Sequence, residues 1–185
     1  MSESHASQGR AKRIKLVGSD SVGSPPKEFS DDNDIAQMKY HIHNFANREE
    51  KRGEFFKTGT INAHGHPWKL MIYPRGTNES DTYAEYVAVY LVYVGGNTKP
   101  DPVVAKGMIQ TKTTRYQLTK YEFCNEKNHR SGGWLDWSTR KNIITNDCND
   151  AGTLTITIEL QVATEKKSVW YPQPTYYDRT GSQLF

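Results

Sequence analysis

The chain has 185 residues and a formal net charge of +3, and 35% of its residues are hydrophobic. This length excludes a barrel enzyme of about 250 residues or an enzyme with two large domains, and so small a charge does not by itself favour nucleic acid as a partner. The low hydrophobic content indicates either a small core or an unfolded portion of the chain.

Residues 1–34 are the first segment, and few of them are apolar. Such a segment cannot bury enough surface to offset its ordering entropy, so we expect a disordered leader. Four basic residues gather in it: Arg10, Lys12, Arg13 and Lys15. They resemble a short nuclear localisation signal, although a solvated charge run has the same composition. The sequence leaves both interpretations open, and with them a nuclear or a cytoplasmic location.

The body, residues 35–165, carries the patterns of β-strands. We predict strands over residues 38–45, 55–61, 68–73, 86–94, 103–110, 116–124 and 153–162. The last alternates apolar and polar residues, which is typical of a half-buried strand, while residues 86–94 have the Val and Tyr content of a central strand. A short helix is expected near residues 138–143, and residues 166–185 are expected to form an extended tail. Short strands separated by turns predict an all-β antiparallel sandwich.

Two pairs of histidines have the spacing His-x-His: His41 with His43, and His64 with His66. They could hold a transition metal only with a third ligand supplied by the fold, and turn or surface histidines show the same spacing. We therefore favour turn and surface positions and expect no metal.

Catalytic motifs do not stand out in the sequence. The patterns of zinc proteases, serine hydrolases and phosphate-binding loops are absent from it. Cys124 and Cys148 are expected to be inert thiols of a reduced intracellular protein, since two cysteines do not make a disulfide framework. With no run of 18 apolar residues and no apolar signal segment, we expect no membrane partner. We predict that the chain is not an enzyme and uses no cofactor.

Several segments together carry the signature of one family. They are residues 40–45 (YHIHNF), 64–76 (HGHPWKLMIYPRG), 86–91 (YVAVYL), 104–106 (VAK), 132–137 (GGWLDW), Asp147 and 153–156 (TLTI). In this order they resemble the MATH (meprin and TRAF homology, TRAF-like) domains, across about residues 36–163. The resemblance implies an eight-stranded antiparallel TRAF-like β-sandwich, in agreement with the strand patterns.

The resemblance also implies a non-catalytic module that binds short extended, Ser/Thr-rich peptides of partner proteins. Similarity to the MATH domain of speckle-type POZ adapters implies a substrate or partner adapter in ubiquitin-related pathways, with ubiquitin-ligase or deubiquitinase components as partners. Two alternatives stay open: a MATH segment at the N-terminal end of a larger enzyme such as a deubiquitinase, and a TRAF-like receptor adapter. The peptide motif itself does not follow from the resemblance.

The family's groove gives a set of candidate binding positions. The peptide-binding positions that the resemblance implies are Tyr86, Gly107, Tyr121, Gly133, Trp134 and Asp136. Gly107 and Asp136 stand where the family has aromatic residues, and Gly133 stands where it has an acidic residue. We therefore expect a flatter and more polar groove. From periodicity alone, Tyr86 would count as a half-buried packing residue.

Overall fold

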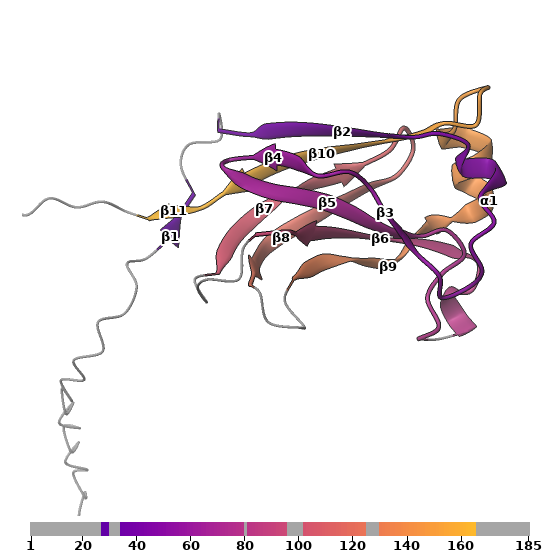
Figure 1. Ribbon diagram of the computed structural model, residues 1–185, viewed down its shortest axis with the longest axis horizontal. Helices are drawn as coiled ribbons and strands as arrows, with labels where there is room; N and C mark the ends of the chain where they lie inside the picture. The colour runs from indigo at the N-terminus through magenta and orange to yellow at the C-terminus, as the bar shows by residue number, and fades with distance from the viewer. Residues whose placement is uncertain (1–26, 30–33, 80, 96–101, 125–129, 166–185) are drawn as a thin grey trace, which may run out of the picture.

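The computed structural model describes residues 27–29, 34–79, 81–95, 102–124 and 130–165. These residues form a sandwich of two antiparallel sheets, with a small two-stranded sheet, β1 (Lys27–Glu28) and β11 (Thr164–Glu165), at one end (Figure 1). The predicted all-β antiparallel sandwich is confirmed. Residues 1–26 and 166–185, which hold most of the expected leader and the expected tail, lie outside the described residues, as does the basic cluster at Arg10, Lys12, Arg13 and Lys15.

Four strands make the first sheet, in the order β2-β10-β7-β8. Their bounds are Ala36–Ile42 for β2, Val103–Gln110 for β7, Arg115–Phe123 for β8 and Leu154–Val162 for β10. β10 is an inner strand, and its Leu154, Ile156, Ile158 and Leu160 are fully buried. Because successive side chains of a strand point to opposite faces, the alternating sequence of β10 covers the core on one side and leaves polar groups on the other.

The second sheet has the order β3-β5-β6-β9, with β4 also paired to β5. The bounds are Phe56–Lys57 for β3, Ile61–Ala63 for β4, His66–Tyr73 for β5, Tyr86–Tyr93 for β6 and Ser131–Thr139 for β9. His64 and Gly65 join β4 to β5 with φ angles of 51° and 71°. Two successive positive φ angles are those of a type I′ hairpin turn, so His64 lies in a turn, as expected, and His66 begins the next strand.

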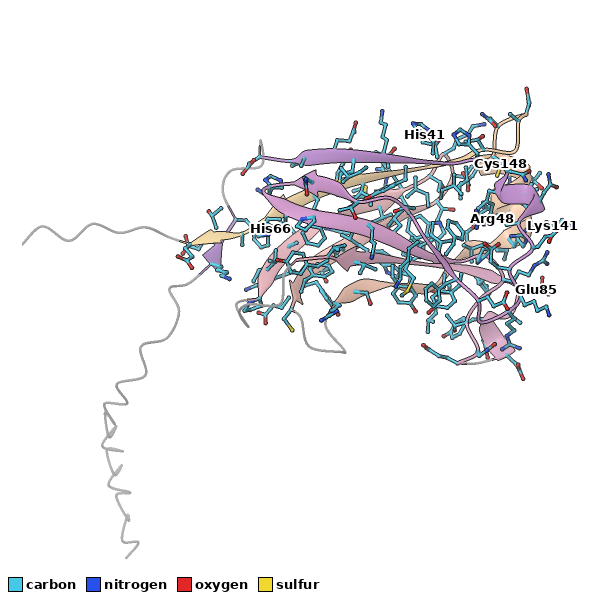
Figure 2. The ribbon with its side chains drawn as sticks, in the orientation of Figure 1. His41, Arg48, His66, Glu85, Lys141 and Cys148 are labelled. Carbon is cyan, nitrogen blue, oxygen red and sulfur yellow. The ribbon has the colours of Figure 1, made fainter. Side chains whose placement is uncertain are left out.

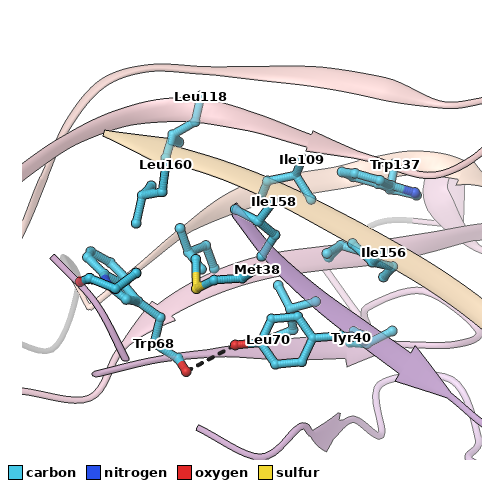
Figure 3. Close-up of a cluster of buried hydrophobic side chains, with 14 of the residues drawn as sticks. Met38, Tyr40, Trp68, Leu70, Ile109, Leu118, Trp137, Ile156, Ile158 and Leu160 are labelled. Atoms are coloured by element: carbon cyan, nitrogen blue, oxygen red, sulfur yellow. Dashed lines mark hydrogen bonds between the residues drawn. The ribbon is translucent and has the colours of Figure 1, made fainter. Parts of the chain in front are cut away.

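The core lies between the two sheets (Figure 3). Trp68, Leu70 and Ile72 of β5 are fully buried and face the apolar side of the first sheet. The Tyr40 hydroxyl donates a hydrogen bond to the Trp68 carbonyl oxygen at 3.1 Å, which joins β2 to β5 across the core. Each fully buried aliphatic or aromatic side chain of this kind contributes about 1.5–3 kcal/mol to folding.

Two predicted strands are shorter than expected. The strand predicted over residues 38–45 ends at Ile42, because Asn44 has a φ of 55° and Phe45 starts a 3-10 helix, η1 (Phe45–Asn47). The strand predicted over residues 55–61 is divided into β3 and β4. Between them the Thr58 hydroxyl accepts a hydrogen bond from the Leu70 N–H at 2.9 Å, so a side chain takes a place that a ladder carbonyl would hold.

The predicted helix near residues 138–143 starts later than expected. Residues 138 and 139 belong to β9, and α1 (Arg140–Asn142) runs into a π-helical turn, η3 (Ile143–Asp147). The Thr139 hydroxyl accepts from the Asn142 N–H at 3.2 Å and so caps α1. Another short 3-10 helix, η2, spans Asp81–Tyr83. In the described part of the chain, no helix has the length and apolar content needed to cross a bilayer.

Arg140 holds one end of the sandwich together. Its guanidinium donates to the carbonyl oxygens of Pro74 at 3.2 Å, Ala46 at 3.0 Å and Arg48 at 3.4 Å. The same group lies 5.5 Å from the centre of the Phe45 ring. One side chain therefore joins the start of α1 to the loops that follow β2 and β5.

Candidate functional site

β8 and β9 are the outer strands of the two sheets on one side of the sandwich, and Figure 1 shows them close together there. We call this side the β8–β9 seam; its residues are Tyr116, Leu118 and Tyr121 of β8 and Gly132, Trp134 and Asp136 of β9. Among the described strands, each of the two pairs with a single neighbour. An outer strand has unpaired N–H and C=O groups, so an extended peptide can add to it by main-chain hydrogen bonds.

Two tyrosine hydroxyls join the outer strands across the seam. The Tyr116 hydroxyl donates to the Asp136 carbonyl oxygen at 3.0 Å, and the Tyr121 hydroxyl donates to the Ser131 carbonyl oxygen at 2.9 Å. One bond is at the first residue of β9 and the other is five residues further along the strand. These two hydrogen bonds hold the edges of the two sheets together. Between them, the main-chain groups of β9 that point away from β6 are open for pairing with a ligand.

Aromatic rings gather at one end of the seam. Tyr116 stacks on Trp137, with ring centres 5.3 Å apart and an angle of 29° between the planes, and it meets Trp134 at 5.2 Å. Trp137 is buried, whereas Trp134 is half-buried. Trp137 therefore anchors the group in the core, and Trp134 presents an apolar surface with one side open to a ligand.

Tyr86 and Asp136 lie beside this aromatic group. Burial raises the pKa of Tyr116, and the Asp136 carboxylate and the Tyr86 hydroxyl add to the rise. These two groups are thus close enough to Tyr116 to act on its charge. The structure brings two of the predicted positions, Trp134 and Asp136, into direct contact with a tyrosine that the prediction left out, and Tyr86, which packs against Tyr83, acts on the pKa of the same tyrosine.

Tyr121 defines the other end of the seam. It packs against Phe123 with ring centres 4.7 Å apart, and burial raises its pKa. A Cβ added at Gly132 would lie 3.4 Å from Tyr121 ring carbons and 3.4 Å from the Leu118 side chain. Tyr121 and Leu118 therefore cover Gly132, and a larger residue there would push Tyr121 outward.

Gly133 lies where β9 comes closest to β6. A Cβ at this position would overlap the Val89 carbonyl oxygen and would lie 2.6 Å from the Tyr90 Cα. Gly133 also pairs directly with Tyr90 in the ladder. The absence of an acidic side chain at residue 133 is therefore a condition for the close approach of the two strands.

Gly107 is separate from these aromatic contacts. Its added Cβ would overlap the Glu159 carbonyl oxygen and would lie 3.2 Å from the Leu160 Cα, so glycine allows β7 to approach β10 closely. The residue also lines a hollow of about 400 Å³ with Lys106 and Met108. The structure gives Gly107 a place in the packing of the first sheet, where it pairs with Leu160 of β10 on one side and Leu118 of β8 on the other.

The histidines of β2 point to the outer face of the first sheet. His41 Nδ1 lies 3.1 Å from the Thr155 hydroxyl oxygen, and His43 Nδ1 lies 3.2 Å from that of Thr153. In the turn after β4, His64 Nε2 lies 2.9 Å from the Leu160 carbonyl oxygen. Within the described residues, no three His, Cys, Asp or Glu side chains gather to hold a metal ion.

Both cysteines have free, half-buried thiols. Burial raises the pKa of Cys148, and the neighbouring Asp147 carboxylate adds to the rise. Since the thiolate is the reactive form, the Cys148 thiol is a poor nucleophile near neutral pH.

Tyr116 of the seam and Trp137 beside it are the aromatic residues that sequence reasoning missed. Strict alternation along β8 would place Tyr116 and Tyr121 on opposite faces, because they are five residues apart. The pairing of β7 with β8 shifts its register between Ala105 and Gly107, and this irregularity returns Tyr121 to the face of Tyr116. A similar shift of the β6–β9 pairing lets Trp134 and Trp137 meet. The tyrosine and tryptophan content of residues 116–137 was the available signal.

Comparison with protein-family models gives a match over the folded body. A family model for the MATH domain matches residues 37–159, well over half of the chain. The matched stretch runs from β2 into β10 and contains both strands of the β8–β9 seam. A search of curated proteins found no match.

Proposed function

We propose that this chain, which belongs to the MATH domain family, binds a short extended peptide along the β8–β9 seam. Membership of this family makes the chain a protein-interaction module, of a fold that is generally non-catalytic. The observation that carries the proposal is the open stretch of β9 between two tyrosine hydroxyl bonds, with the half-buried Trp134 ring beside it.

The seam suits a peptide with hydroxyl side chains. The added strand pairs with the outward N–H and C=O groups of β9. An apolar peptide side chain rests on Trp134, and serine or threonine hydroxyls donate to the exposed Asp136 carboxylate. This arrangement is the basis for proposing Ser/Thr-rich motifs of partner proteins as the ligand.

Titration of the chain with a Ser/Thr-rich peptide library tests the proposal. Trp134→Ala and Tyr86→Ala are expected to weaken the selected peptides about tenfold or more, because truncation of an aromatic anchor removes a central contact. Tyr73→Ala is the matched control: Tyr73 is half-buried on β5, where it meets Phe55 and Tyr90. If both seam variants bind as well as the wild type, the seam is not the peptide site.

We further propose that the bound partners belong to ubiquitin-related pathways and that the chain serves there as an adapter. The resemblance of residues 64–76 and 86–91 to MATH domains supports this, since in speckle-type POZ adapters such a domain recruits substrates to a ubiquitin ligase. A pull-down with mass spectrometry, comparing wild type with Trp134→Ala, should recover ubiquitin-ligase or deubiquitinase components with the wild type alone. Recovery of the same components with both proteins would contradict the proposal.

Two other roles remain proposals for the same fold. A transcript that continues past residue 185 into a protease domain would favour the MATH segment of a deubiquitinase. A stable trimer in light scattering would favour a TRAF-like receptor adapter.

The basic cluster at Arg10, Lys12, Arg13 and Lys15 is proposed to direct the chain to the nucleus. A fluorescent fusion that stays nuclear after all four residues are changed to alanine would refute this.

A further inference from the structure

The opposite side of the sandwich has a second opening. β2 is the outer strand of the first sheet, at the other end of the order from β8, and β3 is the outer strand of the second sheet. A hollow of about 260 Å³ lies between them. We call this side the β2–β3 edge; its main residues are His41, His43, Arg48, Phe56, Lys57 and Thr58.

The β2–β3 edge is cationic. Lys57 and Arg48 carry positive charge, His41 and His43 lie beside them, and among the described residues no carboxylate lines the hollow. His41 of β2 and His43, which follows the end of the strand, are both exposed, and Figure 2 shows His41 pointing away from the body of the sandwich. The side chains that a ligand would meet along this edge therefore favour negative charge.

Arg48 is held in place at one end of the hollow. Its Nε donates to both carboxylate oxygens of Glu50, at 2.9 Å and 3.1 Å, and its guanidinium lies 3.6 Å from the centre of the Phe56 ring. This pair offsets the Arg48 charge, since Glu50 lies outside the lining of the hollow and beside the arginine. Lys57, which is exposed on β3, is therefore the main source of positive charge for a ligand.

The main chain of β2 is available for pairing. Among the described strands, β2 is paired to β10 alone, over residues 36–42. Tyr40 ties β2 to β5 on the core side, because its hydroxyl donates to the Trp68 carbonyl oxygen. Burial raises the pKa of Tyr40 to about 12, so the hydroxyl keeps the proton that it donates. A rigid outer strand is the template that strand addition requires.

We infer that the β2–β3 edge is a second docking surface, which takes an extended acidic segment of a partner protein paired with β2. Alternate side chains of the added strand place carboxylates near Lys57 at the mouth of the hollow, while the side chains between them lie beside His41 and His43. A second copy of β2 fits poorly, because Lys39, His41 and His43 of the two copies would face each other. This inference does not depend on peptide binding at the β8–β9 seam.

Fluorescence polarisation of the full chain with a labelled peptide of alternating glutamate and valine tests the inference. Lys57→Glu is expected to weaken binding about fivefold or more. Lys120→Glu makes the same charge change at an exposed position of β8 and is expected to have little effect. A peptide of the same sequence with alternate amides N-methylated is expected to bind at least about tenfold more weakly, since it loses the main-chain hydrogen bonds. Trp134→Ala should bind the acidic peptide like the wild type.

Each other outcome overturns the inference. Equal losses in Lys57→Glu and Lys120→Glu would show attraction to overall charge, and equal affinity of the N-methylated peptide would exclude strand addition. Loss of binding in Trp134→Ala would move the acidic peptide to the seam. A stable dimer in sedimentation that Lys57→Glu changes would show that a second copy fills the edge.

Hydrogen exchange gives an independent test of strand addition: exchange should slow at the outward amides of residues 37–43 when the peptide binds, and unchanged exchange there would overturn the inference.

Discussion

Replacing Gly133 by alanine tests how closely β6 and β9 approach each other beside the seam. The added Cβ would overlap the Val89 carbonyl oxygen and would lie 2.6 Å from the Tyr90 Cα. Both contacts are with backbone, so no side-chain rotation relieves them. The two strands must move apart at their centre, where Gly133 pairs with Tyr90.

The expected loss of stability follows from this movement. Separating the strands weakens one or two ladder hydrogen bonds, at about 1 kcal/mol each, and the strain of an overpacked site adds about 1–3 kcal/mol. Alanine gains back about 0.5–1 kcal/mol, because it restricts the unfolded chain more than glycine does. These terms together lead us to expect that Gly133→Ala lowers the free energy of unfolding by about 1–4 kcal/mol.

Two other glycines calibrate the measurement. A Cβ at Gly132 would meet only side-chain atoms at 3.4 Å, so Gly132→Ala should cost less than about 1 kcal/mol. A Cβ at Gly59 would meet nothing within 4 Å, so Gly59→Ala should stay within about 0.5 kcal/mol of the wild type. Urea unfolding followed by tryptophan fluorescence gives all three values. A Gly133→Ala protein as stable as Gly59→Ala would refute the close approach of β6 and β9.

Three further predictions concern single side chains. Tyr116→Phe keeps the ring stacking but loses the hydrogen bond to β9, so urea unfolding should show a loss of about 1 kcal/mol; a loss near zero would mean that water replaces the bond. Burial raises the pKa of Tyr40 from 10.0 to about 12, so the folded state holds this proton more tightly than the unfolded state. The stability that results is complete below about pH 10 and is lost as the pH rises through 12, and Tyr40→Phe should flatten the decline of stability over this range; an unchanged decline would assign it to other groups. Arg140→Lys should lower the free energy of unfolding by about 1–3 kcal/mol, because lysine cannot reach three carbonyl oxygens at once. Both proteins are measured by urea unfolding. Lys141→Met, a change at the exposed neighbouring residue, should leave the free energy of unfolding within about 0.5 kcal/mol of the wild type. Similar losses in the two variants would argue against the role of Arg140.

Alternation was enough to predict β10, which repeats apolar and polar residues through its whole length. The strand predicted over residues 103–110, after the breaker at residues 99–102, has the bounds of β7. β9 was not predicted as a strand, because Gly132 and Gly133 lack the side chains that favour strands and show no period. Their use is clear only in three dimensions, where Tyr121 covers one glycine and the β6 backbone approaches the other.

The candidate site was predictable in part for a related reason. The family motif indicated Trp134 and Tyr86, since these residues stand in recognisable segments. Tyr116 could not be predicted as a site residue from the sequence, because only the register shift between β7 and β8 puts it on the same face of β8 as Tyr121. A shift of this kind arises from the pairing of two strands and is not encoded in the local period of either one.

The two hydroxyl bonds across the seam also limit how long a paired ligand can be. The carbonyl oxygens of Ser131 and Asp136 already accept from Tyr121 and Tyr116, so between these two bonds a ligand can pair only with those main-chain groups of residues 132–135 that point away from β6. Only a short stretch of a bound peptide can therefore form main-chain hydrogen bonds with β9, and the peptide residues on either side of it leave the sheet. Short windows give fast dissociation, so on this geometry a lasting association would come from several copies of a motif in one partner or from clustering of the module itself, through a raised effective concentration.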